Sequence, residues 1–146
     1  MAGNRTGQEP SLLVIDDDDD VVSLVSRALE NDGWRVTTCQ DAAQAHAQVK
    51  EEQPTVVLLD IALDTPGRGW SLLQHLRDDP ATRNVPVIVF SSQLAQLEER
   101  EAWLLDQRIS VLSKPFELDD LYDAVREFQP RQASVRTAQD QTTTNS

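Results

Sequence analysis

Cysteine is nearly absent from this sequence. Cys39 is the single cysteine among 146 residues, so the chain cannot form an internal disulfide. A chain without disulfides fits a reducing compartment, and we expect a cytoplasmic protein. Cys39 stands in a strand-like stretch, where a small core side chain is expected rather than a reactive thiol.

Long apolar runs and basic side chains are also scarce. No stretch approaches the roughly 18–20 apolar residues that cross a bilayer. The N-terminal segment MAGNRTGQEPS has no apolar core of the kind that a secretory signal needs. The 13 lysines and arginines are outnumbered by 25 acidic residues, which gives a formal charge of −12. We therefore expect neither a membrane nor a nucleic acid as a direct partner.

The length fits one domain with a proper core. Residues 1–10 and 129–146 are polar and aperiodic, and we expect both segments to be disordered. The folded domain is then predicted to span residues 11–128.

Short apolar runs alternate with helical patterns inside this range. Runs rich in Val, Ile and Leu are typical of strands that are buried on both faces of a parallel sheet. Four such runs are Ser11–Ile15, Thr55–Leu59, Val87–Phe90 and Ile109–Leu112, and Trp34–Cys39 has the mixed character of an edge strand. The helical patterns cover residues 21–29, 41–52, 70–77, 94–107 and 117–128. Five alternations of strand and helix predict a doubly wound α/β fold with a five-stranded parallel sheet.

Polar side chains follow the buried runs where each strand ends. Asp16 and Asp17 follow the first run, Asp60 the second, Ser91 the third, and Lys114 comes shortly after the fourth. Because the carboxyl ends of parallel strands share one edge of the sheet, these groups should lie together. Crowded carboxylates need a cation, and Mg²⁺ suits a site of oxygen ligands. A metal, an ammonium and a hydroxyl together suit the transfer of a phosphoryl group to a carboxylate.

Each of these residues also has a simpler interpretation when it is taken alone. The run Asp16–Asp20 could be a solvated acidic turn, and Asp60 could be an ordinary turn residue. Ser91 could cap a helix, and Lys114 could be a surface lysine. The combination of all four positions at strand ends favours a common site.

With these motifs, the chain resembles the response regulator receiver family over about Ser11–Phe128. The segments LLVIDDDDD, VVLLDIALD, PVIVFSS and SKPF are similar to the family's acidic pair, phosphoacceptor strand, hydroxyl-bearing strand and Lys-Pro motif. The resemblance implies a flavodoxin-like (βα)5 fold with strand order 2-1-3-4-5.

The resemblance also implies roles for individual residues. Asp60 would accept a phosphoryl group from a histidine kinase or a histidine phosphotransfer protein. Asp16, Asp17, Asp60 and the backbone carbonyl of Ala62 would hold Mg²⁺, and Ser91 and Lys114 would contact the phosphoryl oxygens. The Lys114–Pro115 bond would be cis. Such a protein is a phosphoacceptor and not a turnover enzyme, and it would signal to a protein target through its fourth and fifth helices.

Several positions depart from the family pattern. Leu63 and Asp64 stand where the family usually has Met-Pro, and Gly69 is one residue further along than expected. Val111 replaces the aromatic residue that commonly reports activation. Ala62 cannot orient a water molecule, which leads to the hypothesis of slow self-dephosphorylation. The tuning position after Ser91 is Gln93.

Other residues could serve output or a second chemistry. Trp103 could lie on the output face or simply pack at its helix edge. His46 and His75 stand in helical stretches, where neither a phosphohistidine relay nor a metal pair is expected.

Two other functions share part of this sequence pattern. A haloacid dehalogenase-type phosphatase would have a second aspartate two residues after the nucleophile, where this chain has Ala62. A pseudo-receiver would bind partners without being phosphorylated, and Val111 and the shifted Gly69 are compatible with that reading.

Overall fold

In the residues that the computed structural model describes, 10–62, 67–91 and 94–129, the centre of the fold is a sheet of five parallel strands. They are β2 (Ser11–Ile15), β3 (Arg35–Cys39), β4 (Val56–Asp60), β5 (Val87–Ser91) and β6 (Ser110–Ser113). The strands lie in the order β3-β2-β4-β5-β6, which is 2-1-3-4-5 along the chain. The predicted doubly wound, flavodoxin-like sheet is confirmed.

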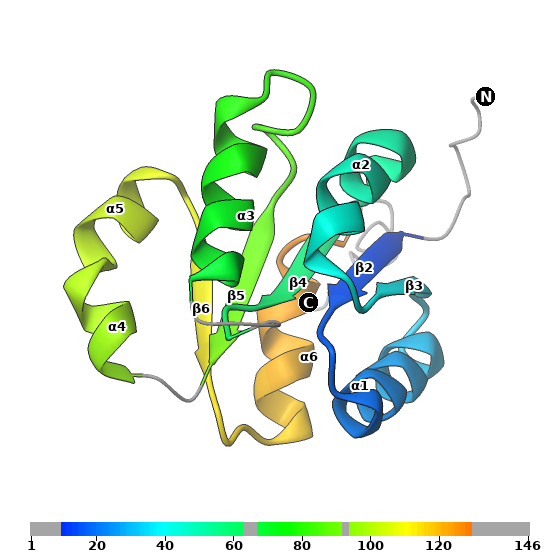
Figure 1. The fold of residues 1–146 in the computed structure, drawn as a ribbon. Coiled ribbons are helices and arrows are strands. Elements are labelled where there is room, and N and C mark those ends of the chain that lie inside the picture. Colours follow the sequence, from blue (N-terminus) through cyan, green and yellow to red (C-terminus); the bar gives the residue numbers. More distant parts are fainter. Residues whose placement is uncertain (1–9, 63–66, 92–93, 130–146) are drawn as a thin grey trace, which may run out of the picture.

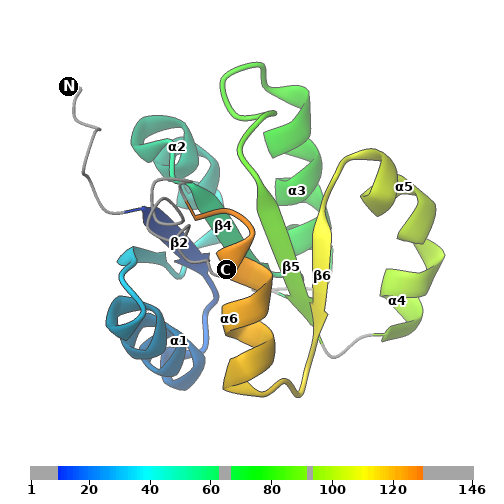
Figure 2. The same cartoon turned by 180° about the vertical axis from the view of Figure 1, so that it is seen from behind.

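Helices cover both faces of the sheet (Figures 1 and 2). One face carries α1 (Asp19–Asn31) and α6 (Leu118–Arg126). The other carries α2 (Ala42–Glu52), α3 (Arg68–Asp78), α4 (Leu94–Glu99) and α5 (Glu101–Asp106). None of the described helices is long and apolar enough to cross a membrane.

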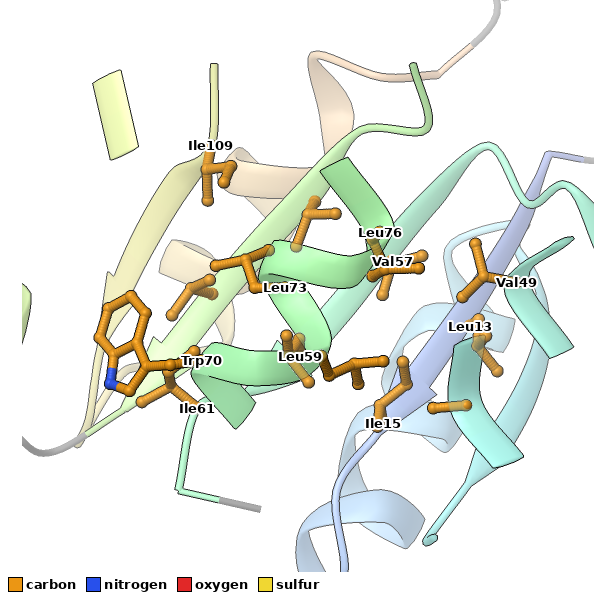
Figure 3. Packing of buried hydrophobic residues seen from close by; sticks show 14 of the residues in the cluster. Leu13, Ile15, Val49, Val57, Leu59, Ile61, Trp70, Leu73, Leu76 and Ile109 are labelled. Carbon is orange, nitrogen blue, oxygen red and sulfur yellow. The ribbon is translucent and has the colours of Figure 1, made fainter. Parts of the chain in front are cut away.

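Side chains of each strand alternate between two hydrophobic cores. Leu12 and Val14 of β2 belong to the cluster beneath α1 and α6, whereas Leu13 and Ile15 belong to the cluster beneath α2 and α3. Figure 3 shows the second cluster, in which Leu73 of α3 lies over the sheet. Because the central strands are buried on both faces, they are apolar at nearly every position. Each such buried side chain contributes roughly 1.5–3 kcal/mol to folding.

Three strands, β4, β5 and β6, extend one residue beyond their predicted ends, and for β4 and β5 the added residue belongs to the predicted site. Asp60 pairs in register with Phe90, and Ser91 pairs with Ser113, so both polar residues are the last members of their strands. The backbone of each is therefore held by the sheet, and the side chains at this edge stand on a rigid support.

The prediction of a single helix over residues 94–107 is wrong. It is divided into α4 and α5 at Arg100, whose backbone angles are φ −108° and ψ 11°. The Arg100 N–H donates to the Leu97 carbonyl, three residues back, which is a tighter turn than that of an α-helix. The break coincides with a contact from another helix, because the Arg100 guanidinium lies 4.4 Å from the centre of the Trp70 ring.

Some predictions concern residues that the structure does not describe. The segments expected to be disordered, 1–10 and 129–146, lie outside the described residues except for Pro10 and Gln129. Leu63, Asp64 and Gln93 also lie outside them.

Candidate functional site

The predicted site residues come together at the carboxyl edge of the sheet. Asp16 follows β2, Asp60 ends β4, Ser91 ends β5 and Lys114 follows β6. Because β2, β4, β5 and β6 are neighbours in the sheet, one edge collects side chains that are far apart in sequence. Asp16, Asp60 and Ser91 are buried there, at 0%, 6% and 1% exposure.

The acidic run after β2 divides into groups with different local roles. Asp16 and Asp17 supply carboxylates to the site. Asp18 is the N-cap of α1, and its side chain accepts hydrogen bonds from the N–H groups of two following residues. Asp19 and Asp20 lie in the first turn, where negative charge is favoured by the helix dipole. The first two residues of the run therefore belong to the carboxylate cluster, and the other three form the start of α1.

Three carboxylates form a compact cluster. One oxygen from each of Asp16, Asp17 and Asp60 lies within 4.8 Å of the others. Burial is the main cause that raises the pKa of Asp16 from 3.8 to about 7, and the charge of Asp60 raises it further. A hydrogen bond from the Asp18 N–H to Asp16 Oδ1, at 3.0 Å, acts in the opposite direction. In the protein without a cation, Asp16 therefore resists ionisation.

Lys114 brings a positive charge to the cluster. Its Nζ lies 3.5 Å from Asp60 Oδ2 and 3.8 Å from Asp16 Oδ2. The same ammonium lies 4.6 Å from the centre of the Phe90 ring, which is a cation–π distance. The sequence indicated Phe90 only as a strand residue and did not predict this contact. The backbone N–H of Lys114 donates to the Ser91 carbonyl at 2.9 Å. The Lys114–Pro115 bond is cis, as the resemblance implied.

The side chain of Asp60 is held in a defined orientation. Asp60 Oδ1 accepts a hydrogen bond from the Ala62 N–H at 3.0 Å, while Oδ2 faces Lys114. The Ile61 N–H donates to the Phe90 carbonyl at 3.2 Å, which anchors the residue after Asp60 to β5. One carboxylate at this edge is thus fixed by both the backbone and an ammonium.

The donor set of the cluster fits a hard divalent cation. Asp16 Oδ2 is buried and has no hydrogen-bond partner among the described residues, and Lys114 Nζ lies beyond hydrogen-bond length at 3.8 Å. When ionised, the three carboxylates and one ammonium leave two uncompensated negative charges in a small volume. Oxygen ligands and a double negative charge are what Mg²⁺ prefers, whereas no histidine or cysteine is among the ligand atoms of the cluster.

The turn after β4 is packed tightly against α3. Gly69 lies so close to Ile61 that an added Cβ would be 2.1 Å from the Ile61 carbonyl oxygen. The glycine that seemed displaced in the sequence is therefore required by this close approach. Gly67, with φ at +92°, is the N-cap of α3 and adopts a conformation that glycine accepts at little cost.

The remaining candidate residues lie away from the cluster. Trp103 is partly buried and packs against the core, which favours the packing interpretation over the output one. Val111 is 43% exposed on β6. His46 and His75, which the sequence did not relate to each other, have stacked rings with centroids 6.4 Å apart.

The chain is similar in sequence to known regulatory proteins. The chain is 33% identical to the transcriptional regulatory protein PrrA of Mycobacterium tuberculosis over 135 residues. That match covers 92% of this chain and 56% of PrrA, so the chain spans about half the length of such curated relatives.

Solved structures share the fold. The receiver domain of the Francisella response regulator 1452 is 28% identical, with a TM-score of 0.70, and the match covers 82% of this chain and 95% of that one. The receiver domain of a sensor histidine kinase from Pseudomonas aeruginosa PAO1 is 22% identical, with a TM-score of 0.69 and coverage of 83% and 98%. That structure has a magnesium ion coordinated in its active-site cleft.

The family model for the response regulator receiver domain matches residues 12–126. This range contains the whole carboxylate cluster and Lys114. The chain therefore belongs to the response regulator receiver domain family.

Proposed function

We propose that Asp60 accepts a phosphoryl group from a phosphohistidine, on a sensor histidine kinase or a histidine phosphotransfer protein, in a reaction that depends on Mg²⁺. The observation that carries this proposal is the cluster of three carboxylates beside the Lys114 ammonium, with Asp60 at its edge. As a receiver domain, the chain is a phosphoacceptor and not a turnover enzyme. Family membership also removes the phosphatase alternative.

The proposed magnesium ligands are the carboxylates of Asp16, Asp17 and Asp60 together with the backbone carbonyl of Ala62. The unpartnered oxygen of Asp16 and the all-oxygen donor set support this assignment. Bound Mg²⁺ would supply positive charge to the phosphoryl oxygens and would favour the ionised form of Asp16.

The transfer itself requires Asp60 as a nucleophile. An oxygen of the ionised carboxylate attacks phosphorus, the P–N bond to the donor imidazole breaks, and its electron pair returns to the ring nitrogen, which takes up a proton from solvent. The product is an acyl phosphate. The hydrogen bond from the Ala62 N–H to Asp60 Oδ1 orients the carboxylate for this attack.

Two further side chains are proposed to stabilise the transferred group. Lys114 Nζ, 3.5 Å from Asp60 Oδ2, can pair with a phosphoryl oxygen as negative charge moves onto Asp60. Ser91 is buried at the end of the neighbouring strand β5, where its hydroxyl can donate to another phosphoryl oxygen. In both roles the side chain positions the phosphoryl group and stabilises its negative charge, and it transfers no proton.

We also propose that the signal leaves through the face formed by α4, α5, β6 and α6, by contact with a protein target. A cavity of about 620 Å³ lies between α5 and β6, and its lining includes Leu105 and Val111, which are 70% and 43% exposed. Exposed apolar side chains beside a hollow are typical of protein contact surfaces.

The test uses acetyl phosphate as a small phosphodonor, with and without Mg²⁺, and reads the intact mass of the protein. We expect a gain of one phosphoryl group that requires Mg²⁺ and disappears in Asp60→Asn. Asp123→Asn is the matched control, since that carboxylate is 78% exposed on α6. If neither wild type nor the control gains mass under any condition, the pseudo-receiver alternative is correct.

A further inference from the structure

A second polar cavity lies outside the carboxylate cluster, between α2 and α3. Its volume is about 280 Å³. The two helices are neighbours on the same face of the sheet (Figure 1). Ala42 and Ala43 at the start of α2 are too small to fill the space between the helices, which leaves the cavity open.

The polar lining of this cavity consists of hydrogen-bond donors. Arg68, Ser71 and His75 follow one another along one face of α3, and His46 faces them from α2. A guanidinium is always charged, and the hydroxyl and imidazole groups can each donate a hydrogen bond. Among the described residues, no acidic side chain lines the cavity, although the chain carries 25 acidic residues and a charge of −12.

The ring of His46 is held in place from the outside of the cavity. His46 Nε2 lies 2.9 Å from Asp79 Oδ2, and the same oxygen lies 3.2 Å from Lys50 Nζ. Asp79 is thus shared between the His46 ring and the Lys50 ammonium. His46 itself lines the cavity, and the His75 ring stacks beside it with the ring centroids 6.4 Å apart.

The N-terminus of α3 adds to the positive character of the cavity. Its N-cap residue is Gly67, which has no side chain of its own to cap the first turn, and Arg68 is the first residue of the helix. The helix dipole places partial positive charge at a first turn and favours a nearby negative charge there. The side-chain donors and the helix end therefore favour the same class of ligand.

We propose that the cavity between α2 and α3 binds an oxyanion, namely a phosphate or carboxylate group, through Arg68, Ser71 and His75, with His46 closing the opposite wall. Charge-assisted hydrogen bonds from a guanidinium suit such a group well. The site lies at the same edge of the sheet as the carboxylate cluster, because α2 and α3 begin where β3 and β4 end. Its described lining shares no residue with that cluster, so the proposal goes beyond the phosphoacceptor function.

The test is a titration of the ¹⁵N-labelled full chain with inorganic phosphate, followed by amide chemical shifts. EDTA is present and the experiment is repeated in Asp60→Asn, so that binding at the carboxylate cluster does not contribute. Sodium chloride keeps the ionic strength constant. A second arm uses the tripeptide Gly-phosphoserine-Gly, which separates a free anion from a phosphorylated side chain as the source of the group.

We expect saturable shifts confined to the first turns of α2 and to α3. Arg68→Gln should weaken binding about tenfold, the loss typical of one charge-assisted contact. His75→Gln should weaken binding too, and Arg83→Gln, which removes an exposed arginine outside the cavity, should have no effect.

Comparison of the phosphate and tripeptide titrations distinguishes the two possible sources of the anion. Tighter binding of the tripeptide than of phosphate would assign the site to a side chain on a partner, and the reverse would assign it to a free ion. The proposal is overturned if shifts do not saturate, if they spread over the surface, or if Arg68→Gln and Arg83→Gln behave alike. None of these outcomes depends on whether Asp60 is phosphorylated.

Discussion

Replacement of Gly69 by alanine tests the packing between α3 and the turn that follows Asp60. Gly69 lies inside α3, where helix propensity alone favours alanine over glycine by about 1 kcal/mol. An added Cβ, however, would lie 2.1 Å from the Ile61 carbonyl oxygen and 2.6 Å from its carbonyl carbon. Real Cβ atoms essentially never approach another heavy atom within 3.0 Å, so the helix or the turn must move by about 1 Å.

The expected cost follows from these opposing effects. Overpacking typically costs about 1–3 kcal/mol, and more where the obstacle is backbone rather than a flexible side chain. Because the obstacle here is the Ile61 backbone, the cost should lie at the upper end of this range, and after subtraction of the propensity gain we expect Gly69→Ala to lower the free energy of unfolding by about 2 kcal/mol. Because Ile61 directly follows Asp60, the same displacement should slow phosphorylation by acetyl phosphate.

The assay combines urea unfolding with the rate of mass gain from acetyl phosphate. Gly33→Ala is the control, since Gly33 has φ at +96° and open space around it. It should lose about 1–2 kcal/mol from backbone strain and keep the wild-type phosphorylation rate. If Gly69→Ala is as stable as wild type and reacts equally fast, the close approach does not matter and the reasoning is wrong.

Three further predictions concern individual side chains. Because the pKa of Asp16 is about 7 in the fold against 3.8 in its ordinary state, this carboxyl adds stability below about pH 4 and loses it as the pH rises towards 7. In EDTA at pH 8, Asp16→Asn should therefore be more stable than wild type by about 2–4 kcal/mol in urea unfolding. Mg²⁺ at 10 mM should reduce this difference in stability by roughly 1–3 kcal/mol. Equal stability at pH 5 and pH 8 for both proteins would refute this prediction. Ala62→Asn should shorten the lifetime of the phosphorylated protein several-fold, as followed by intact mass after removal of the donor, and an unchanged lifetime would disprove the hypothesis of slow hydrolysis. Burial raises the pKa of the Cys39 thiol and leaves it 6% exposed, so native protein should react with a thiol reagent at least about tenfold more slowly than protein in urea; equal rates would contradict its core position.

The sheet and the carboxylate cluster could be predicted because both follow from order along the chain. Buried parallel strands are continuous apolar runs, and the residue at the end of each run has only one edge at which to lie. Asp60 and Ser91 were placed correctly at that edge, although the sheet pairing extends one residue further than the apolar pattern.

Other features could not be predicted because they depend on contacts between distant helices. Periodicity favours one helix over 94–107, but Trp70 of α3 contacts Arg100 at the point where α4 ends. The stacked pair His46 and His75 has no local spacing that reveals it, because α2 and α3 bring the two rings together. The role of Gly69 was hidden for the same reason, since only the fold shows its approach to Ile61.

The central claim is that Asp60 itself carries the phosphoryl group. The most direct measurement treats the phosphorylated protein with borohydride, which reduces an acyl phosphate to an alcohol and so converts the modified aspartate into homoserine, and then maps that residue by peptide mass spectrometry. The account predicts homoserine at position 60 only, and only after incubation with both Mg²⁺ and acetyl phosphate. Homoserine at Asp16, Asp17 or any other position, or none at all after a confirmed mass gain, would contradict it.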